Sequence, residues 1–380
     1  MNDPIWSGLD RHTVRGVNGY YSAHGIGLPM MLAPFYYFGG VFLSQVFLSF
    51  LSALLVMYIY KTCLKAVSNM RASLAVSLIL GFASLIVPYS NQIFPEIPMA
   101  LILITSIYYI CLKQVKSSRA LFILGTLMGY SLFLKTAYAV FIIPFTIYIV
   151  GLHRSNRVKQ SAAYLIPVTV LGLALMAYQE TAFGNPLRTP QTFQAGNPFN
   201  GLFGLIFDRY FGLFTYSPAL AISVFGISHF YRSSKRVFAV ASTSFLGLYL
   251  ASSLWIAWQG GWSYPARLIM PVVPLAALPL AFSIGRYHRR LWFKLLLSLS
   301  VTLSLLINFS ITWVRGLGLD AAPAKQKIFH ELFLWVMENF NVDISPLFPD
   351  FNQSLLNVSW LWVASLLALL LVIIDWSRRN

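Results

Sequence analysis

Apolar segments of membrane-spanning length recur along the whole chain, and they constrain its fold more than any other feature. Short charged turns separate eleven of them, at 38–60, 72–88, 97–112, 120–134, 137–152, 162–183, 211–230, 237–255, 268–284, 291–313 and 358–374. Because lipid cannot hydrogen-bond a free backbone, such segments cross a bilayer as helices. The pair around Lys135 is short, which indicates a hairpin that reverses near the membrane surface. The sequence therefore predicts one all-α polytopic membrane domain over residues 1–380, with about 11 transmembrane helices.

The composition excludes several other classes of protein. Hydrophobic residues make up 58% of the chain and charged residues 10%, whereas soluble domains carry roughly a quarter charged residues. A cytosolic enzyme and a disordered chain are therefore excluded. Only two cysteines, Cys63 and Cys111, are present, so the chain is not a disulfide scaffold. Glycine-rich phosphate loops, zinc-protease motifs and hydrolase nucleophile motifs are absent from the sequence.

The distribution of charge predicts which ends of the segments face the cytoplasm. If the segments alternate in direction, 18 of the 27 lysines and arginines fall in the turns of one side, and ten of the eleven acidic residues fall on the other. Basic turns of membrane proteins face the cytoplasm. The net charge of +16 is thus a signal of topology, and we expect no nucleic-acid partner.

The side that this alternation places outside carries the elaborated segments. They are the first segment, 1–28, the main loops 184–210 and 315–357, and two shorter loops, 89–96 and 256–267. The cytoplasmic turns are short and plain, so we expect the protein to act on its outer face. Within the last long loop, residues 326–340 form an amphipathic pattern that predicts a helix on the outer membrane surface.

The segment from Asn18 to Gly40 is rich in glycine and proline. Irregular backbone is tolerated at membrane depth only where protein or water satisfies it. The segment therefore predicts a broken or re-entrant helix that lines a cavity, with a plain turn before a helix as the alternative. His24 lies in this segment and is a candidate site residue, although one histidine alone is a weak signal.

Three ionisable residues lie at outer ends of apolar segments, where a charge is costly and often functional. Glu96 either caps a helix, which its dipole favours, or serves as a base or metal ligand. Lys135 either extends its ammonium to the interface or holds an anionic headgroup. Arg267 follows Trp262 and Tyr264, and a guanidinium beside aromatic side chains suits a sugar or a phosphate ester. The aromatic residues alone would be typical of an interface belt.

Asp208 is a second candidate carboxylate, in the loop 184–210. Arg209 is adjacent to it, and adjacent side chains point in different directions on any regular element. We therefore expect Asp208 and Arg209 to have separate partners rather than to pair with each other.

Taken together, these motifs resemble the GT-C membrane glycosyltransferases, in particular bacterial relatives of protein O-mannosyltransferases and of the lipid A aminoarabinose transferase. The resemblance is carried, in order along the chain, by Tyr21-Ser22-Ala23-His24-Gly25-Ile26-Gly27-Leu28-Pro29, Pro95-Glu96, Leu134-Lys135-Thr136, Phe183-Gly184-Asn185-Pro186, Tyr210-Phe211-Gly212-Leu213-Phe214 and Gly260-Gly261 through Arg267 to Pro271. Each motif is weak alone, and together they are moderately specific.

The resemblance implies transfer of a hexosyl or pentosyl group from a polyprenyl-phosphate donor to a lipid, glycan or protein acceptor. The reaction would take place among membrane lipids, on the extracytoplasmic face of the bacterial inner (plasma) membrane. No cofactor is indicated, no metal ligands are assigned, and a divalent metal stays open. The implied catalytic residues are Glu96, Asp208 and His24, and the implied substrate-binding residues are Arg267, Lys135, Tyr264, Trp262 and Tyr21.

The chain departs from the family pattern at its start. The family normally begins with another span and an outer loop that carries an aspartate base, and this chain starts beyond that point; Asp3 and Asp10 are not in such a motif. The expectation is a truncated member or one with a different base. A transporter or lipid flippase and a catalytically inactive remnant are the alternatives, but transporters tend to show internal repeats, which we do not find.

The alternation of the segments also makes a geometric prediction. His24, Glu96, Lys135 and Arg267 all fall at outer segment ends. We therefore expect the four side chains to converge on one cavity, although they are far apart in the sequence.

Overall fold

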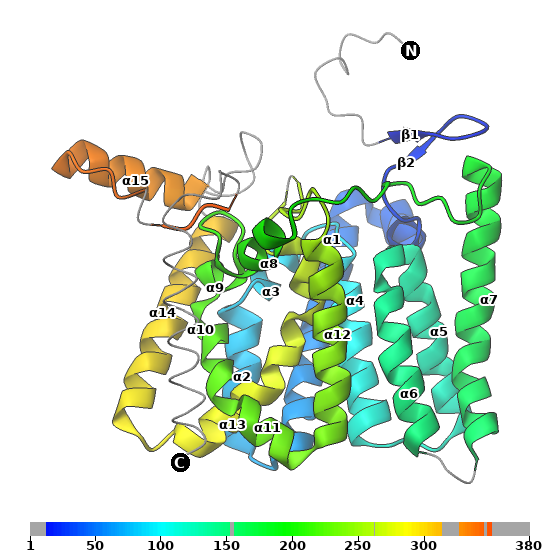
Figure 1. Ribbon diagram of the computed structural model, residues 1–380, viewed down its shortest axis with the longest axis horizontal. Helices are drawn as coiled ribbons and strands as arrows, with labels where there is room; N and C mark the ends of the chain where they lie inside the picture. Colours follow the sequence, from blue (N-terminus) through cyan, green and yellow to red (C-terminus); the bar gives the residue numbers. More distant parts are fainter. Residues whose placement is uncertain (1–12, 153–155, 262, 314–326, 346–347, 352–380) are drawn as a thin grey trace.

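The computed structural model describes residues 13–152, 156–261, 263–313, 327–345 and 348–351 as a bundle of helices that run roughly parallel to one another (Figure 1). The two ends of the bundle differ. One end, at the top of Figure 1, carries the strands β1 and β2 and the helices α8 and α15, and it is called the loop-rich end below. The other end carries mostly short turns.

The chain enters at the loop-rich end through an antiparallel hairpin and then passes through the helices in order. The first elements are β1 (Thr13–Arg15), β2 (Tyr20–Ser22), α1 (Gly27–Val67), α2 (Met70–Phe82), α3 (Ile86–Tyr89), α4 (Glu96–Ser106), η2 (Ile107–Leu112), α5 (Ser118–Leu134), η3 (Thr136–Phe141), α6 (Ile142–Leu152) and α7 (Arg157–Phe183). They are followed by α8 (Pro198–Phe207), α9 (Leu213–Tyr216), α10 (Pro218–Ala221), η4 (Ile222–Gly226), α11 (Ile227–Ser233), α12 (Lys235–Ser253), η5 (Arg267–Ala276), α13 (Ala277–Tyr287), α14 (Leu291–Trp313) and α15 (Lys327–Phe340).

The all-α polytopic class predicted from the sequence is confirmed. Four helical stretches of the described residues are long and apolar enough to cross a membrane: Gly27–Val67, Arg157–Phe183, Arg267–Tyr287 and Leu291–Trp313. The first ten predicted segments all fall on helical elements, although several are broken into shorter pieces, and the eleventh, 358–374, lies outside the described residues. The count of eleven spans stays a prediction. The predicted reversal at Lys135 is present, because η3 and α6 return beside α5 (Figure 1).

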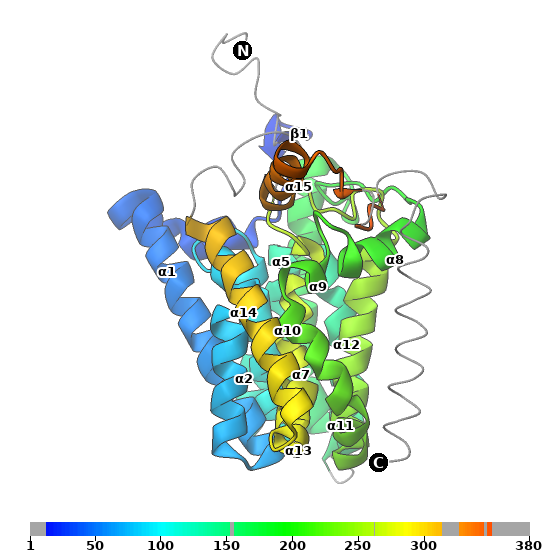
Figure 2. The same cartoon turned by 90° about the vertical axis from the view of Figure 1, so that its left-hand side faces the viewer.

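Helix α1 is broken near its start, as the glycine- and proline-rich segment predicted. The break lies at Gly39 and Gly40, and Gly40 has φ 59° and ψ −147°. Only glycine adopts that conformation without steric strain. The part of α1 before the break therefore takes its own direction at the loop-rich end, while the longer remainder descends through the bundle (Figure 2).

The segment before α1 lies against the end of α5. A side-chain carbon added at Gly27 would lie 2.6 Å from the carbonyl carbon of Phe133, so only glycine allows this approach. The hydroxyl of Tyr130 donates a hydrogen bond to the carbonyl oxygen of Gly27 (2.5 Å). These contacts place the neighbourhood of His24 beside the turn that carries Lys135.

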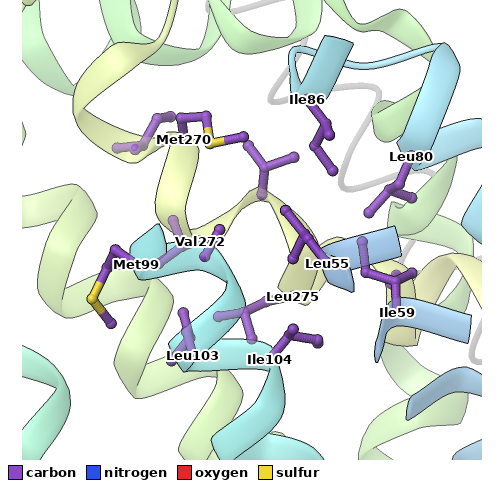
Figure 3. Packing of buried hydrophobic residues seen from close by; sticks show 14 of the residues in the cluster. Leu55, Ile59, Leu80, Ile86, Met99, Leu103, Ile104, Met270, Val272 and Leu275 are labelled. Carbon is purple, nitrogen blue, oxygen red and sulfur yellow. The ribbon is translucent and has the colours of Figure 1, made fainter. Parts of the chain in front are cut away.

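A buried apolar core lies below the loop-rich end (Figure 3). Helices α4 and η5 pack against each other there, and both begin at the loop-rich end. The core side chains come from α1, α2, α3, α4 and η5: Leu55, Ile59, Leu80, Ile86, Met99, Leu103, Ile104, Met270, Val272 and Leu275. Because the core fixes the two helices side by side, it also fixes their first residues, Glu96 and Arg267.

Helix η5 is a 3₁₀-helix of ten residues, and it contains Pro271 and Pro274. Runs of 3₁₀-helix longer than three or four residues are uncommon. Proline has no N–H and clashes with the preceding turn of an α-helix. The two prolines therefore account for the tighter winding, and the chain returns to an α-helix at Ala277, where α13 begins.

Helix α15 lies across the direction of the other helices at the loop-rich end (Figure 1). Phe333 is buried, whereas Leu332, Trp335 and Phe340 are exposed. The predicted helix at 326–340 is thus present, and its place on a membrane surface stays a prediction.

Candidate functional site

A cavity of about 610 Å³ lies at the loop-rich end. Its walls come from the segment before α1, the start of α4, the turn between α5 and η3, the end of α7, the loop 189–193, the end of α12 and the start of η5. These pieces are far apart in the sequence. A cavity of this volume falls in the range of sites for small molecules.

The cavity brings together the four residues that the alternation of segments predicted to converge. Glu96, Lys135 and Arg267 line it, and so does His24. The geometric prediction is confirmed, whereas the chemical roles of these residues stay proposals. Two cations and one carboxylate give the described lining a net formal charge of +1 when His24 is neutral.

Glu96 and Arg267 form an ion pair. Nε of Arg267 donates to Oε1 of Glu96 at 3.0 Å, and the side chains of Arg267 and Glu96 are 14% and 1% exposed, respectively. Oε2 of Glu96 is also buried, yet it accepts no hydrogen bond from any described residue. Glu96 is at the same time the first residue of α4, where the helix dipole favours a carboxylate. The cap that the sequence suggested is thus present, and the same carboxylate faces the cavity.

The guanidinium of Arg267 is held on two further sides. Its Nη1 donates to the carbonyl oxygen of Gly260 at 3.3 Å. Its Cζ lies 4.1 Å from the ring centroid of Phe94, a cation–π arrangement. Phe94 and Glu96 come from the same short segment, so one turn of the chain supplies both the apolar and the anionic contact.

Lys135 is the second cation of the cavity. It follows the last residue of α5 with an extended backbone, and its Nζ lies 5.9 Å from the ring centroid of Trp255. Within the described parts of the chain, no carboxylate lies at ion-pair distance from it. Burial lowers the pKa of Lys135 to about 8; attraction to Glu96 opposes this shift and repulsion from Arg267 adds to it. The cavity therefore holds a cation that is available to an anion.

His24 lies in the cavity wall just before α1 and is exposed. Its backbone N–H donates to Oγ of Ser22 at 3.1 Å, which fixes the local turn. The imidazole can thus reach a bound molecule from the open side of the cavity.

Two of the predicted aromatic residues lie behind the described cavity lining rather than in it. The ring of Tyr21 contacts Tyr178 and Phe183 of α7 with centroids 6.5 and 5.4 Å apart, and Tyr178 lines the cavity. Tyr264 is buried, and its carbonyl oxygen accepts a hydrogen bond from the hydroxyl of Tyr89 (2.6 Å). The structure places both as supports of the wall. Trp262 lies outside the described residues.

Asp208 does not line the cavity formed by the described residues. Its Oδ1 accepts the backbone N–H groups of Tyr210 and Phe211 at 2.8 and 3.1 Å, and its Oδ2 accepts that of Phe351 at 2.9 Å. Burial raises the pKa of Asp208 to about 7, although these hydrogen bonds favour its charged form. The structure thus corrects the grouping of Asp208 with Glu96: it binds the segment around Phe351 to the turn after α8.

Arg209 has partners of its own, as expected. Its Nη2 lies 2.6 Å from Oδ2 of Asp350, and its Nη1 donates to the carbonyl oxygen of Ser345 at 2.7 Å. Asp208 and Arg209 therefore do not pair with each other. Together they tie the segment after α15 to the turn after α8.

A comparison with protein families gives the cavity a context. The sequence pattern of the dolichyl-phosphate-mannose-protein mannosyltransferase family matches residues 24–178. The chain is a GT-C glycosyltransferase-like membrane protein. No curated protein and no solved structure matches it. The matched region begins at His24 and contains Glu96 and Lys135, whereas Arg267 lies beyond it.

The GT-C-like cavity contains residues that the sequence analysis did not identify. Trp255 lies beside Lys135, Phe94 against Arg267, and Gln179 in the wall formed by α7. The loop 189–193 also lines the cavity. Trp255 was visible as an interface aromatic, but only the packing of α12 beside the α5–η3 turn shows that it contacts a cation.

The described part of this GT-C-like chain offers no ready ligand set for a metal ion. No three His, Cys, Asp or Glu side chains gather there closely enough to hold one. The structure therefore assigns no metal ligand in addition to the residues above, and the divalent metal left open by the sequence stays open.

Proposed function

We propose that this chain moves a hexosyl or pentosyl group from a polyprenyl-phosphate donor to a lipid, glycan or protein acceptor. The supporting observation is the cavity that holds Lys135 and Arg267 beside Glu96. Its net formal charge of +1 matches the single negative charge of a phosphodiester. The rings of Trp255 and Phe94, which also line the cavity, offer apolar surface to a sugar face or an isoprenyl chain.

In the proposed reaction, Lys135 and Arg267 bind the phosphate of the donor, and Glu96 takes the proton of the acceptor hydroxyl. The acceptor oxygen forms a bond to the anomeric carbon of the sugar. The bond between that carbon and the phosphate oxygen breaks, and its electron pair leaves with the phosphate. Oε2 of Glu96, which accepts no hydrogen bond from the described residues, is the proposed proton acceptor. His24 is proposed to contact the donor or the acceptor at the open side.

The experiment that tests this function uses the full chain in liposomes that contain a polyprenyl-phosphate-linked sugar. We expect release of polyprenyl phosphate together with transfer of the sugar to an acceptor. Passage of the intact donor from one leaflet to the other, without cleavage, would instead support the flippase alternative and contradict the transferase.

The proposed site of the reaction is the extracytoplasmic face of the bacterial inner membrane, and cysteine labelling tests it. Val158 lies at the start of α7 and Leu187 just after its end, and they are 85% and 74% exposed, whereas Cys63 and Cys111 are buried. In intact cells, we expect a membrane-impermeant maleimide to label Leu187→Cys, and to label Val158→Cys only after permeabilisation. The reverse pattern would invert the proposed topology.

The pKa of Lys135 predicts how donor binding depends on pH. Lys135 carries its charge below about pH 8, so affinity for a phosphodiester should be highest there and fall as the pH rises further. Loss of one nearby charge in a partly dehydrated site should weaken binding about tenfold. Titration calorimetry between neutral and alkaline pH measures this. Lys135→Arg stays charged and should remove the dependence; the same decline in that variant would contradict the assignment.

A further inference from the structure

The ion pair between Glu96 and Arg267 is incomplete. A guanidinium and a carboxylate can form two parallel hydrogen bonds, but here only Oε1 is engaged, at 3.0 Å from Nε. Oε2 is buried and accepts no hydrogen bond from the described residues. A buried carboxylate oxygen without a partner is costly and requires an explanation. A pair with a purely structural purpose would be expected to use both oxygens.

The described contacts of Arg267 engage only part of its hydrogen-bonding capacity. A guanidinium has five N–H donors, and these contacts involve its Nε, with Glu96, and its Nη1, with the carbonyl oxygen of Gly260. Arg267 lines the cavity together with Lys135. A phosphate bound beside Lys135 would therefore have a second cation within the same cavity, one that a carboxylate partly neutralises.

We infer that Arg267 exchanges partners during the reaction, passing from Glu96 to the leaving phosphate as Glu96 takes up the proton of the acceptor. This partner exchange rests on the proposed function. The phosphodiester of the donor carries one negative charge, and the polyprenyl phosphate that leaves carries two. Protonation of Glu96 removes one negative charge from the cavity lining, whose net formal charge rises from +1 to +2. The total charge of cavity and bound phosphate thus stays constant.

The atoms and charges balance in this scheme. The acceptor hydroxyl loses its proton to Oε2 of Glu96, and the acceptor oxygen bonds to the anomeric carbon. The electron pair of the broken carbon–oxygen bond becomes the second negative charge of the phosphate. A neutral Glu96 no longer attracts Arg267 as an ion, so the guanidinium can turn to that new charge. The other ionisable side chains around the pair are Lys135, Tyr89 and Tyr138, whose interactions with Glu96 and Arg267 do not replace the lost ion pair.

Glu96→Gln tests the inference, because glutamine has the shape and the neutrality of a protonated glutamate. The probes are farnesyl phosphate, a dianion at pH 7.5, and farnesyl methyl phosphate, a monoanion. Binding to the full chain in detergent is measured by calorimetry. We expect Glu96→Gln to bind the monoester about tenfold more tightly than the unaltered chain and the diester about threefold more tightly, because the electrostatic gain scales with the charge of the probe.

Two further variants show whether the gain depends on Arg267. In Glu96→Gln combined with Arg267→Gln, the gain for the monoester should disappear. Glu180→Gln removes an exposed carboxylate of α7 outside the cavity lining, and it should leave both affinities unchanged. A folded Glu96→Gln protein that binds the monoester no better than the unaltered chain would overturn the partner exchange alone. An unaltered chain that binds neither probe would overturn the proposed function, and the partner exchange with it.

A measurement on the unaltered chain decides the matter if Glu96→Gln does not fold. Calorimetry in two buffers of different ionisation enthalpy counts the protons taken up on binding. When Arg267 turns to the phosphate, Glu96 is left buried without an ion pair, which favours its protonated form. The monoester should therefore take up about one proton more than the diester. Equal uptake for the two probes would contradict the exchange.

Discussion

Sugar transfer is expected to fall about a thousandfold when Glu96 is replaced by glutamine, within the range that loss of a general base produces. Glu96 is the only carboxylate in the described cavity lining, and glutamine cannot take the acceptor proton. The variant keeps the size of the side chain and one hydrogen-bond acceptor for Arg267. The measurement is the rate of polyprenyl phosphate release under single-turnover conditions, which separates the chemical step from product release.

The controls for this prediction separate loss of the base from loss of the fold. Glu180→Gln should transfer sugar at the rate of the unaltered chain, because Glu180 is exposed on α7 and does not line the cavity. Glu96→Asp keeps a carboxylate and should retain part of the rate. If a folded Glu96→Gln protein transfers sugar within about tenfold of the normal rate, Glu96 is not the general base.

Lys135→Met should lower the rate of transfer about a hundredfold, the usual cost of removing one group that stabilises a developing charge. Lys135 has no ion-pair partner among the described residues, so its removal leaves no buried carboxylate unpaired. Methionine also preserves an apolar contact with the ring of Trp255. The fold should therefore survive, and the loss should be in phosphate stabilisation. Donor affinity and the single-turnover rate measure the two effects separately.

Lys135→Arg is the matched control for this variant. It retains the positive charge and should keep most of the activity, although its planar head differs in shape from an ammonium. A folded Lys135→Met protein with normal donor affinity and normal rate would show that Lys135 binds no phosphate. In that case its place in the cavity would reflect only the reversal of the chain after α5.

The sequence predicted which charged residues would share an end of the bundle. Apolar segments that alternate in direction must bring every second turn to the same face. Glu96, Lys135 and Arg267 each interrupt apolar sequence at such a turn, so their common location followed from counting segments. The broken start of α1 was also predictable, because Gly39 and Gly40 stand directly before a long apolar run.

The sequence could not predict how these residues contact one another. Glu96 and Arg267 are 171 positions apart, and they pair because α4 packs beside η5. Alternation in direction gives the level of a residue along the bundle but not its lateral neighbours. For the same reason Tyr21 and Tyr264 were assigned to substrate, although their described contacts support the wall.

Asp208 shows a second limit of interpreting charges from the sequence. An isolated carboxylate in a loop has the same pattern whether it contacts a substrate or backbone amides. Here three N–H groups converge on it, and one of them belongs to Phe351, 143 positions away. No local pattern indicates a contact of that kind, because it depends on where a distant segment returns.

The winding of η5 has a consequence for the level at which Arg267 lies. A 3₁₀-helix rises about 2.0 Å per residue and an α-helix about 1.5 Å. Over the ten residues of η5, the chain therefore advances about 20 Å instead of about 15 Å, a difference close to one α-helical turn. Pro271 and Pro274 act in this sense as a spacer. They lengthen the stretch of backbone between the buried start of α13 and the cavity, and the guanidinium arrives level with the carboxylate of Glu96 rather than one turn below it.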